Sequence, residues 1–579
     1  MDKVLDLRFK GQIDPKLNPL FNKIANDVRS NFNDLVSKIS EPNKTCIDWW
    51  VGGPASRNTL VSPFFHYYCA FHLVDELCRK NYDISEIIVE SFALEKILKQ
   101  YFRVNGKSIQ IKYKGKRLNS HFKQFIIPFV KIPLLLFRRI YQCLCAKKTK
   151  YLQRPISDKN LTLIDVFVFP GYISKDRYYN GLWDNLNSKE RETTFFVPTF
   201  VGIPRKKILS TYEELRTADR NFLIKDDYLK IRDLLFATGH YFRLFKIKIS
   251  QAIVLGIDIS SLVSDELRSM RGYSGAVDAL LNYCFVKRIK QRKINVRLIV
   301  NWFENQVVDK GWNAGFRKFY PESQLVGYRG FVNIPLWLNL YPSKIENDSM
   351  VIPTKIAVMG KGLVESTKEF APSQKVEVSP AFRFQHVWNE SAAKPDTSYF
   401  TIFVALSIMS KESFNILKLV KECLKTTDLN NLRFWIKPHP TMSEETLKKG
   451  LSGKWPEEFI LIEGPSSDYI SSSDIMISGM SSICLETIAL GIPVIVVENL
   501  QGLSFNSIPE EIPQDLWRPC RTYDDIENAI EYYRNRSDGE INGHKEIGLQ
   551  IREDYFEPVT REGVLKFLGI ESGSTFAES

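Results

Sequence analysis

Four short apolar runs between residues 432 and 497 constrain the fold of this chain more than any other feature. They cover 432–436, 459–462, 474–478 and 492–497, and each is bounded by glycine or proline. Between the last two, residues 480–490 have the apolar spacing of a helix that ends at Gly491. Strands that are almost wholly apolar and alternate with helices predict a parallel sheet covered on both faces.

Two of these strand ends carry side chains suited to anions. Lys437 and His439 stand in a Lys-Pro-His-Pro sequence, which neither a central strand nor a helix can continue through. Ser481 and Ser482 follow a glycine where the next helix begins, so their hydroxyls and backbone N–H groups can meet an anion. Ligands of parallel sheets bind outside the carboxyl ends of the strands. The alternative is that the serines only cap a helix and the His-Pro turn only closes a loop.

The order of strand, Lys-Pro-His-Pro, strand, Gly-Met-Ser-Ser, helix with an internal glutamate and Gly-Ile-Pro-Val resembles the C-terminal half of GT-B glycosyltransferases. It is most similar to the branch with His-Pro and Ser-Ser motifs, which includes bacterial sialyl-, polysialyl- and Kdo transferases. CDP-glycerol glycerophosphotransferases share the general pattern. The resemblance implies an α/β fold of two Rossmann-like domains facing across a cleft. It also implies that His439 and the paired serines hold the donor phosphate and that Glu486 binds ribose. The predicted donor-binding residues are Lys437, His439, Pro440, Gly479, Ser481, Ser482 and Glu486, with His439 also catalytic.

The N-terminal half supplies the predicted acceptor site and base. A glycine-rich loop follows the apolar run 45–51, which we interpret as a first strand, and Ser56, Arg57 and Asn58 in it are predicted to bind the acceptor. A surface turn is the equal alternative for this loop. Glu304 follows the strand predicted at 296–300 and is flanked by aromatic residues that limit water, so it is the first candidate general base. The alternative is a glutamate that bonds a neighbouring loop.

The chain departs from the sialyltransferase pattern in one respect. Those enzymes take their base from an acidic-acidic-glycine motif, which occurs nowhere in this sequence. Asp265 and Glu266 are reserve candidates for the base. The Asp-x-Asp motif of metal-dependent GT-A enzymes is also absent, so we predict transfer that needs neither a metal nor a cofactor.

The formal charge of +12 is concentrated in one segment. Residues 96–157 contain sixteen lysines and arginines and no acidic residue, so the rest of the chain is net acidic. Within this segment, residues 122–141 form an apolar body flanked by cations. We therefore predict a membrane-associating insertion at 115–157 that meets an anionic membrane surface through 122–150. The alternative is an apolar hairpin packed on the protein. No recognised nucleic-acid-binding motif accompanies the basic residues.

Composition and the positions of glycine and proline residues predict the domain organisation. We expect an N-terminal extension at 1–44, a Rossmann-like acceptor domain at 45–370, a linker at 371–398, a nucleotide-sugar-binding domain at 399–571 and a disordered tail at 572–579. The nine cysteines are scattered, without a Cys-x-x-Cys pair, and the N-terminus lacks a secretory pattern. We expect a cytoplasmic protein, peripheral on the inner face of the plasma membrane.

These features together predict a glycosyltransferase of surface-polysaccharide biosynthesis. The resemblance favours a donor of CMP-activated Kdo or nonulosonic acid and a membrane-associated glycan acceptor of capsule, O-antigen or lipopolysaccharide synthesis. Three alternatives stay open: a CDP-polyol phosphotransferase of teichoic-acid type, a sugar-nucleotide epimerase of the same fold, and a catalytically silent membrane-associated scaffold.

Overall fold

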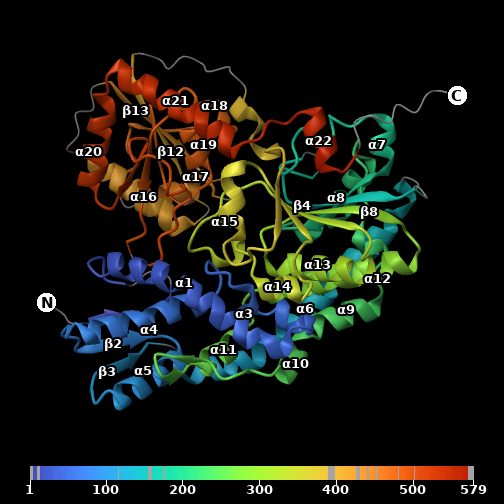
Figure 1. The fold of residues 1–579 in the computed structure, drawn as a ribbon, viewed down its shortest axis with the longest axis horizontal. Helices are drawn as coiled ribbons and strands as arrows, with labels where there is room; N and C mark the ends of the chain where they lie inside the picture. Colours follow the sequence, from blue (N-terminus) through green and yellow to red (C-terminus); the bar gives the residue numbers. More distant parts are fainter. Residues whose placement is uncertain are drawn as a thin grey trace.

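A computed structural model describes most of the chain. The described residues are 4–9, 13–114, 117–153, 159–173, 176–388, 398–407, 409–425, 431–439, 442–451, 454–479, 481–500 and 502–570; at 117–126 only the backbone is described. Within these residues, two six-stranded sheets, each entirely parallel, form two Rossmann-like domains that face each other (Figure 1). The predicted fold class is confirmed.

The C-terminal sheet has the strand order β14-β13-β12-β15-β16-β17. Its strands are β12 (Phe400–Ala405), β13 (Leu432–Lys437), β14 (Phe459–Leu461), β15 (Ile475–Ser478), β16 (Val494–Val497) and β17 (Trp517–Cys520). Its helices are α16 (Ser410–Cys423), α17 (Glu444–Gly450), α18 (Ser467–Ile470), α19 (Ile483–Ile488), α20 (Tyr523–Arg534) and α21 (Asp538–Tyr555). The chain winds outward from β12 to β14 and then returns to the other side of β12, so the direction of winding switches between β12 and β15. Ligands of such sheets bind at this switch.

The N-terminal sheet has the order β11-β10-β9-β8-β4-β5. Its strands are β4 (Leu161–Val168), β5 (Thr194–Phe200), β8 (Val296–Trp302), β9 (Gln324–Arg329), β10 (Lys355–Val358) and β11 (Lys375–Val378). Its longer helices are α8 (Ile208–Thr217), α9 (Ile231–Thr238), α12 (Tyr273–Gln291) and α13 (Val307–Phe319). Strand β11 lies in the segment 371–398 that we predicted as a linker, and it pairs in parallel with β10. Residues 389–397 of that segment lie outside the described residues.

The start of the chain differs from the prediction. Residues 45–51 form no strand but contain helix α2 (Ile47–Trp50), because Trp49 and Trp50 both bury their indoles and donate to the Ser40 hydroxyl and the Lys44 carbonyl, each at 2.9 Å. The start of the predicted acceptor domain belongs instead to a separate three-stranded sheet.

This small sheet forms an N-terminal subdomain of its own. Its strands are β1 (Val4–Asp6), β2 (Glu86–Val89) and β3 (Gln110–Tyr113), and its helices are α1 (Asn18–Ser40), α3 (Gly53–Ser56), α4 (Phe64–Arg79) and α5 (Phe92–Val104). The segment 1–44, predicted as an extension, therefore supplies a strand and a long helix.

The last helix crosses back to the first domain. In α22 (Arg561–Phe567), the Phe567 ring lies 5.5 Å from the Tyr328 ring and 5.3 Å from the Phe382 ring, between centroids. The Leu568 carbonyl accepts a hydrogen bond from Arg297. The predicted C-terminal domain, 399–571, therefore ends with a helix that belongs to the N-terminal core. The predicted tail 572–579 lies outside the described residues.

The predicted insertion is the long helix α6 (Arg117–Lys148), which contains Pro128 and Pro133. One face packs against α8 and α9 and buries residues such as Ile132, Cys143 and Ala146. The opposite face is exposed, with Leu134 and Phe137 among its apolar residues. Of the helices in the described residues, none is long and apolar enough to cross a membrane.

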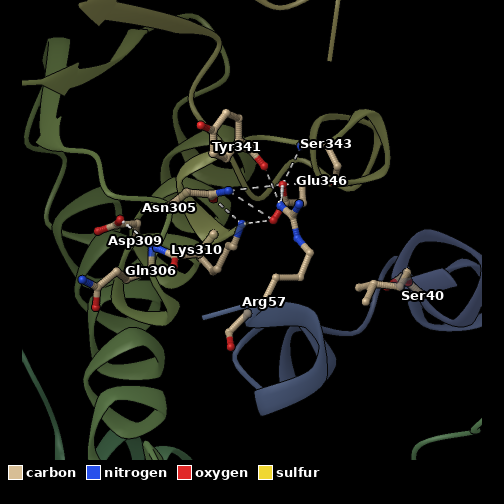
Figure 2. A network of polar contacts seen from close by, with 12 residues as sticks. Ser40, Arg57, Asn305, Gln306, Asp309, Lys310, Tyr341, Ser343 and Glu346 are labelled. Carbon is tan, nitrogen blue, oxygen red and sulfur yellow. Dashed lines mark hydrogen bonds and ion pairs between the residues drawn. The ribbon is translucent and has the colours of Figure 1, made fainter. Parts of the chain in front are cut away.

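A buried ionic network joins the subdomain to the first Rossmann-like domain (Figure 2). The Glu346 carboxylate in α14 (Lys344–Asp348) accepts from Arg57 at 2.7 Å and from Lys310 at 2.5 Å. Arg57 also donates to Asn33 and to the Tyr341 carbonyl. Burial alone would raise the pKa of Glu346, but Arg57 and Lys310 outweigh burial and lower this pKa to about 2. Because this network occupies the Arg57 guanidinium, whose side chain is 1% exposed, we do not retain Arg57 as an acceptor ligand.

Removing the negative charge of this network should destabilise the fold. Glu346→Gln leaves Arg57 and Lys310 buried without their counter-ion, which costs about 3–5 kcal/mol. We expect a lower urea midpoint for unfolding of the N-terminal half. Glu365→Gln is the matched control, because Glu365 pairs with Lys368 at the surface and its side chain is 85% exposed; it should change stability by less than about 0.5 kcal/mol. Equal midpoints for the two variants would contradict the network's importance.

The same network predicts a pH dependence. The folded pKa of Glu346 lies below its ordinary value of 4.5, so its stabilisation is present above about pH 4.5 and is lost as the pH falls towards 2. Wild-type protein should therefore lose more stability than Glu346→Gln over this interval. Parallel losses in acid denaturation would show that Glu346 does not contribute.

Candidate functional site

The two predicted anion-binding motifs meet at one edge of the C-terminal sheet. Ala405, the last residue of β12, lies in register with Lys437 on one side and with Ser478 on the other. Lys437 begins the His-Pro loop, and Ser478 directly precedes the Gly479-Met-Ser-Ser turn. Since neighbouring strands are about 4.8 Å apart, the two loops start about 10 Å from each other. The two motifs thus lie at the same edge of the sheet, while the donor-binding role of these residues stays a prediction.

The paired serines are half-buried just before α19. Ser482 is the N-cap residue, but its side chain makes no capping hydrogen bond, whereas the Ser481 hydroxyl accepts from the Ile483 N–H at 3.4 Å. The Ser507 hydroxyl donates to the Ser481 carbonyl at 2.5 Å and holds the turn. Capping therefore does not account for Ser482. At Gly479 a side chain would collide with the Glu412 carboxylate, so a larger residue there would require that side chain to move.

The His-Pro loop presents two half-buried basic side chains, Lys437 and His439. Burial lowers the pKa of Lys437, against the opposing effects of Glu463 and Asp468. Burial also lowers the pKa of His439, and the positive charges of Arg177 and Arg383 lower it further. The Met442 N–H donates to the His439 carbonyl at 2.8 Å and fixes the loop. Pro440, predicted as part of this site, lies outside the described residues.

Glu486 carries a partner that the sequence did not indicate. Its Oε1 accepts from His386 Nε2 at 2.5 Å. His386 belongs to the 3₁₀ segment η8 (Phe382–Trp388), which follows the N-terminal sheet. Burial opposes the charge on His386, but the Glu486 carboxylate outweighs burial and raises the pKa of His386. The ribose-binding role of Glu486 remains a prediction. One oxygen of its carboxylate is already bonded to His386.

Arg383 stands where the two domains meet. Burial lowers its pKa, and the neighbouring Arg177 adds to this, while Tyr178, Glu486 and Glu304 act in the opposite direction. Glu486 of the C-terminal domain and Glu304 of the N-terminal domain thus both stabilise the positive charge of the Arg383 guanidinium. Sequence reasoning missed Arg177, Arg383 and His386, because they lie in irregular segments without a motif. The run Phe-Arg-Phe-Gln-His at 382–386, aromatic and basic, was the only available signal.

The N-terminal domain contains a cavity of about 410 Å³. The glycine-rich loop lines it with Gly52, Gly53, Ser56 and Asn58, and two of the candidate bases, Glu304 and Glu266, line it as well. Further lining residues include Phe167, Phe169, Tyr178, His240, Leu244 and Tyr273. The structure thus brings the predicted acceptor loop and the predicted base to one cavity, although Arg57 of that loop turns away into the ionic network. Asp265, the other reserve base, is not among the lining residues.

Glu304 is held in place by its own neighbours in the chain. Its carboxylate accepts from the Trp302 indole at 2.7 Å and from the Gln306 side chain, and its carbonyl accepts from Asn339 at 2.8 Å. Asn305 has φ +54°, in the left-handed region, and is fixed by Lys310 and Glu346 (Figure 2). The carboxylate bonds are made within its own loop, so bonding to a neighbouring loop does not explain it. Its role as a base remains a prediction.

A second titratable pair borders the same cavity. His240 Nδ1 lies 2.7 Å from Asp48 Oδ1, and Arg243 donates twice to the same carboxylate at 2.8 Å. Burial raises the pKa of Asp48, but the bonds from His240 and Arg243 lower it overall. An ionised Asp48 can accept a hydrogen bond from the Nδ1–H of His240. No sequence signal linked Asp48 to His240, because 192 positions separate them. In the described part of the chain, no group of three or more His, Cys, Asp or Glu is placed to hold a metal ion.

Comparisons with known proteins give likenesses of structure alone. No model of a protein family matches the chain, and no curated protein matches it. Among solved structures, a UDP-GlcNAc 2-epimerase from Neisseria meningitidis is 12% identical over 70% of this chain and 99% of its own, with a TM-score of 0.42. A trehalose-6-phosphate synthase from Burkholderia multivorans is 10% identical over 71% and 97%, with a TM-score of 0.43. The wall teichoic acid polymerase TagF is 8% identical over 77% and 95%, with a TM-score of 0.37.

Proposed function

We propose that this chain transfers a glycosyl group from a nucleotide-activated donor at the carboxyl edge of the C-terminal sheet to an acceptor in the N-terminal cavity. The position of Arg383 carries the proposal. Its guanidinium lies within electrostatic range of Glu486, at the donor edge, and of Glu304, in the cavity wall. A donor phosphate bound beside Arg383 would therefore lie close to the groups that hold the acceptor.

Cations from both domains would stabilise the leaving phosphate. Lys437, His439 and the Ser481–Ser482 turn would contact it from the C-terminal domain, while Arg177 and Arg383 would contact it from the other side. As the bond between the anomeric carbon and the phosphate oxygen breaks, negative charge grows on the phosphate, and fixed cations in a half-buried site stabilise that charge. Gly479 would allow close approach of the backbone, and Glu486 with His386 would orient the ribose.

The acceptor would occupy the cavity beside Ser56 and Asn58. Its hydroxyl oxygen would form the new bond to the anomeric carbon and would give its proton to Glu304, which carries out the role of general base. The phosphate leaves with the electron pair of the broken bond, so charge and atoms balance without a redox partner.

The charge of the site favours a donor with two anionic groups. A CMP-activated acidic sugar, Kdo or a nonulosonic acid, has one phosphate and one carboxylate, and paired guanidinium groups bind both in forked geometry. The product would belong to a capsule, O-antigen or lipopolysaccharide, built at the cytoplasmic face of the plasma membrane. A CDP-polyol phosphotransferase would use the same phosphate site and is separated from this proposal by the linkage of its product.

Nucleotide binding tests the donor site. Thermal unfolding is compared with CMP, CDP, UDP or GDP at one common concentration. At about a hundred times the dissociation constant of the cytidine nucleotides, these should stabilise the fold by roughly 2.7 kcal/mol and the other nucleotides by less. His439→Ala and Arg383→Gln should each reduce this shift. Arg433→Gln is the matched control, because Arg433 is half-buried at the amino end of the same strand as Lys437 and bonds Thr401. A shift with uridine nucleotides alone would contradict the CMP-sugar donor, and no shift with any nucleotide would contradict the donor site.

The pKa of His439 predicts proton uptake on binding. In the free protein this pKa lies below its ordinary value of 6.5, so the ring is neutral near pH 7. A bound phosphate raises the pKa, so CMP should bind more tightly as the pH falls from about 8 to about 6. Calorimetry in buffers of different ionisation enthalpy should detect the proton, and His439→Gln should abolish that uptake. A pH-independent affinity in the wild type would rule out His439 as a phosphate ligand.

Glu304→Gln should separate binding from chemistry. The change keeps the shape and a hydrogen-bonding oxygen but removes the proton acceptor, so the transfer rate should fall about 10²- to 10⁴-fold with little change in nucleotide affinity. Glu445→Gln, at an exposed pair with Lys449, is the control. A transfer rate within about threefold of the wild type would assign the base to another residue of the cavity, such as His240.

A further inference from the structure

We propose that an anionic lipid bilayer docks on a face formed jointly by α6, by α9 and by the segment 242–248, and that this face lies next to the N-terminal cavity. We call it the docking face. The inference rests on the proposed function only for the identity of the molecule in the cavity. The exposure, charge and packing of its residues define the face itself. Half of it, the segment 231–248, lies outside the insertion that the sequence indicated.

The apolar side chains of the docking face come from three elements. Phe129 and Phe137 of α6 are 59% and 68% exposed, and Phe242 and Phe245 are 50% and 55% exposed. The face consists of the exposed residues Phe129, Val130, Leu134, Phe137, Ile231, Leu235, Phe236, Phe242 and Phe245. Soluble proteins rarely gather so many exposed apolar side chains without a binding partner.

These elements lie side by side. Helix α6 packs along α9, and α9 contacts α10 (His240–Arg243), as their neighbouring positions at the lower edge of Figure 1 also show. The rings of Phe129 and Phe242 are 6.4 Å apart, between centroids, which joins the first element to the last. The aromatic side chains therefore belong to one surface, although more than a hundred residues separate some of them.

The charge of the docking face selects an anionic partner. Exposed cations stand among the apolar residues: Lys131, Arg138, Arg232, Lys246 and Lys248. Residues 129–151 contain no acidic residue, and the single one in 231–248, Asp233, is buried and paired with Arg288. Aromatic rings that insert into the interface and lysines and arginines that meet lipid headgroups are the two components of binding to an anionic membrane.

The cavity lies directly behind the docking face. His240 and Leu244, between the exposed Leu235 and Phe245, line it, and Arg139 of α6 forms an ion pair with Asp278 in its wall. Val61 and Val201, each 48% exposed, provide an apolar rim. An amphipathic acceptor fits this arrangement: its acyl or prenyl chain stays in the bilayer, and its polar head enters the cavity towards Glu304. We therefore assign the acceptor to the class of lipid-linked glycans.

Vesicle binding tests the docking face. The full chain, without nucleotide, should co-sediment with vesicles of phosphatidylcholine containing about 30% phosphatidylglycerol and far less with phosphatidylcholine alone, and about 0.5 M salt should weaken the binding. The double variant Phe242→Ser, Phe245→Ser should bind about tenfold more weakly or worse, because two half-exposed rings are removed. Ile460→Ser with Leu549→Ser removes side chains of similar exposure, 46% and 50%, from the C-terminal domain and should leave binding unchanged.

A second variant guards against misfolding. Lys246→Glu with Lys248→Glu keeps all apolar side chains and should abolish the preference for anionic vesicles. Wild-type binding by the Phe242→Ser, Phe245→Ser variant or by the Lys246→Glu, Lys248→Glu variant would overturn the proposal. Equal binding of the wild type to neutral and anionic vesicles would overturn it as well, and so would self-association through this face without vesicle binding. Nucleotide-induced stabilisation is measured without lipid, so failure of the donor site and failure of the docking face are observed separately.

Discussion

The N-terminal half depends on one carboxylate that is ionised although it is fully buried. Glu346 accepts from Arg57, from Lys310 and from the Ser343 N–H of its own helix start, so two distant segments converge on it. Burying an isolated charge is prohibitive, and each of these groups is tolerable only because the others are present. The network therefore fixes the glycine-rich loop at Arg57 and the Glu304 loop at Asn305 relative to each other. Residues of both loops line the cavity, so its shape depends on an electrostatic requirement remote from the proposed reaction.

A second constraint concerns the junction between the domains. The segment that leaves the first sheet carries Arg383 and His386, and His386 bonds Glu486 of the second domain. This segment thus connects the domains covalently and also supplies charged groups to the proposed site. Since both partners of the Glu486–His386 pair are partly shielded from water, separation of the domains would expose a charge pair and cost free energy. The contact favours the arrangement in which Arg383 is within electrostatic range of both Glu486, at the edge of the sheet where we propose that the donor binds, and Glu304 in the cavity wall.

The sequence predicted best where a pattern is local. The strands around Lys437 and Ser478 are runs of apolar residues bounded by breakers, and their parallel pairing brought the two motifs to one edge as expected. It failed at 45–51, where two adjacent tryptophans in an apolar run favour a strand but both bury their indoles in a helix. It failed again for Lys375–Val378, because a short, partly polar edge strand among prolines looks like a linker. Arg57 shows what could not be predicted about the site. An arginine is suited to bind an anionic ligand, but only the tertiary structure shows that the anion bound by Arg57 is the Glu346 carboxylate.

Residues that a site gathers from distant segments could not be predicted from one sequence. Asp48 and His240, or Arg383 and Glu486, have no common pattern, since their proximity results from packing of whole domains. The docking face has the same origin. Its helix α6 was recognisable as an apolar and basic stretch, but Phe242 and Phe245 stand in a segment whose composition is unremarkable on its own. The two segments become one surface only because α9 buries Leu234 and Ala237 towards α6 and α12 while it exposes Leu235 and Phe236. A surface shared by an insertion and the domain that carries it is harder to explain as the by-product of either alone. His240 and Leu244, which stand between its exposed residues, line the cavity, so a membrane-bound acceptor would lie near the pocket that contains Glu304.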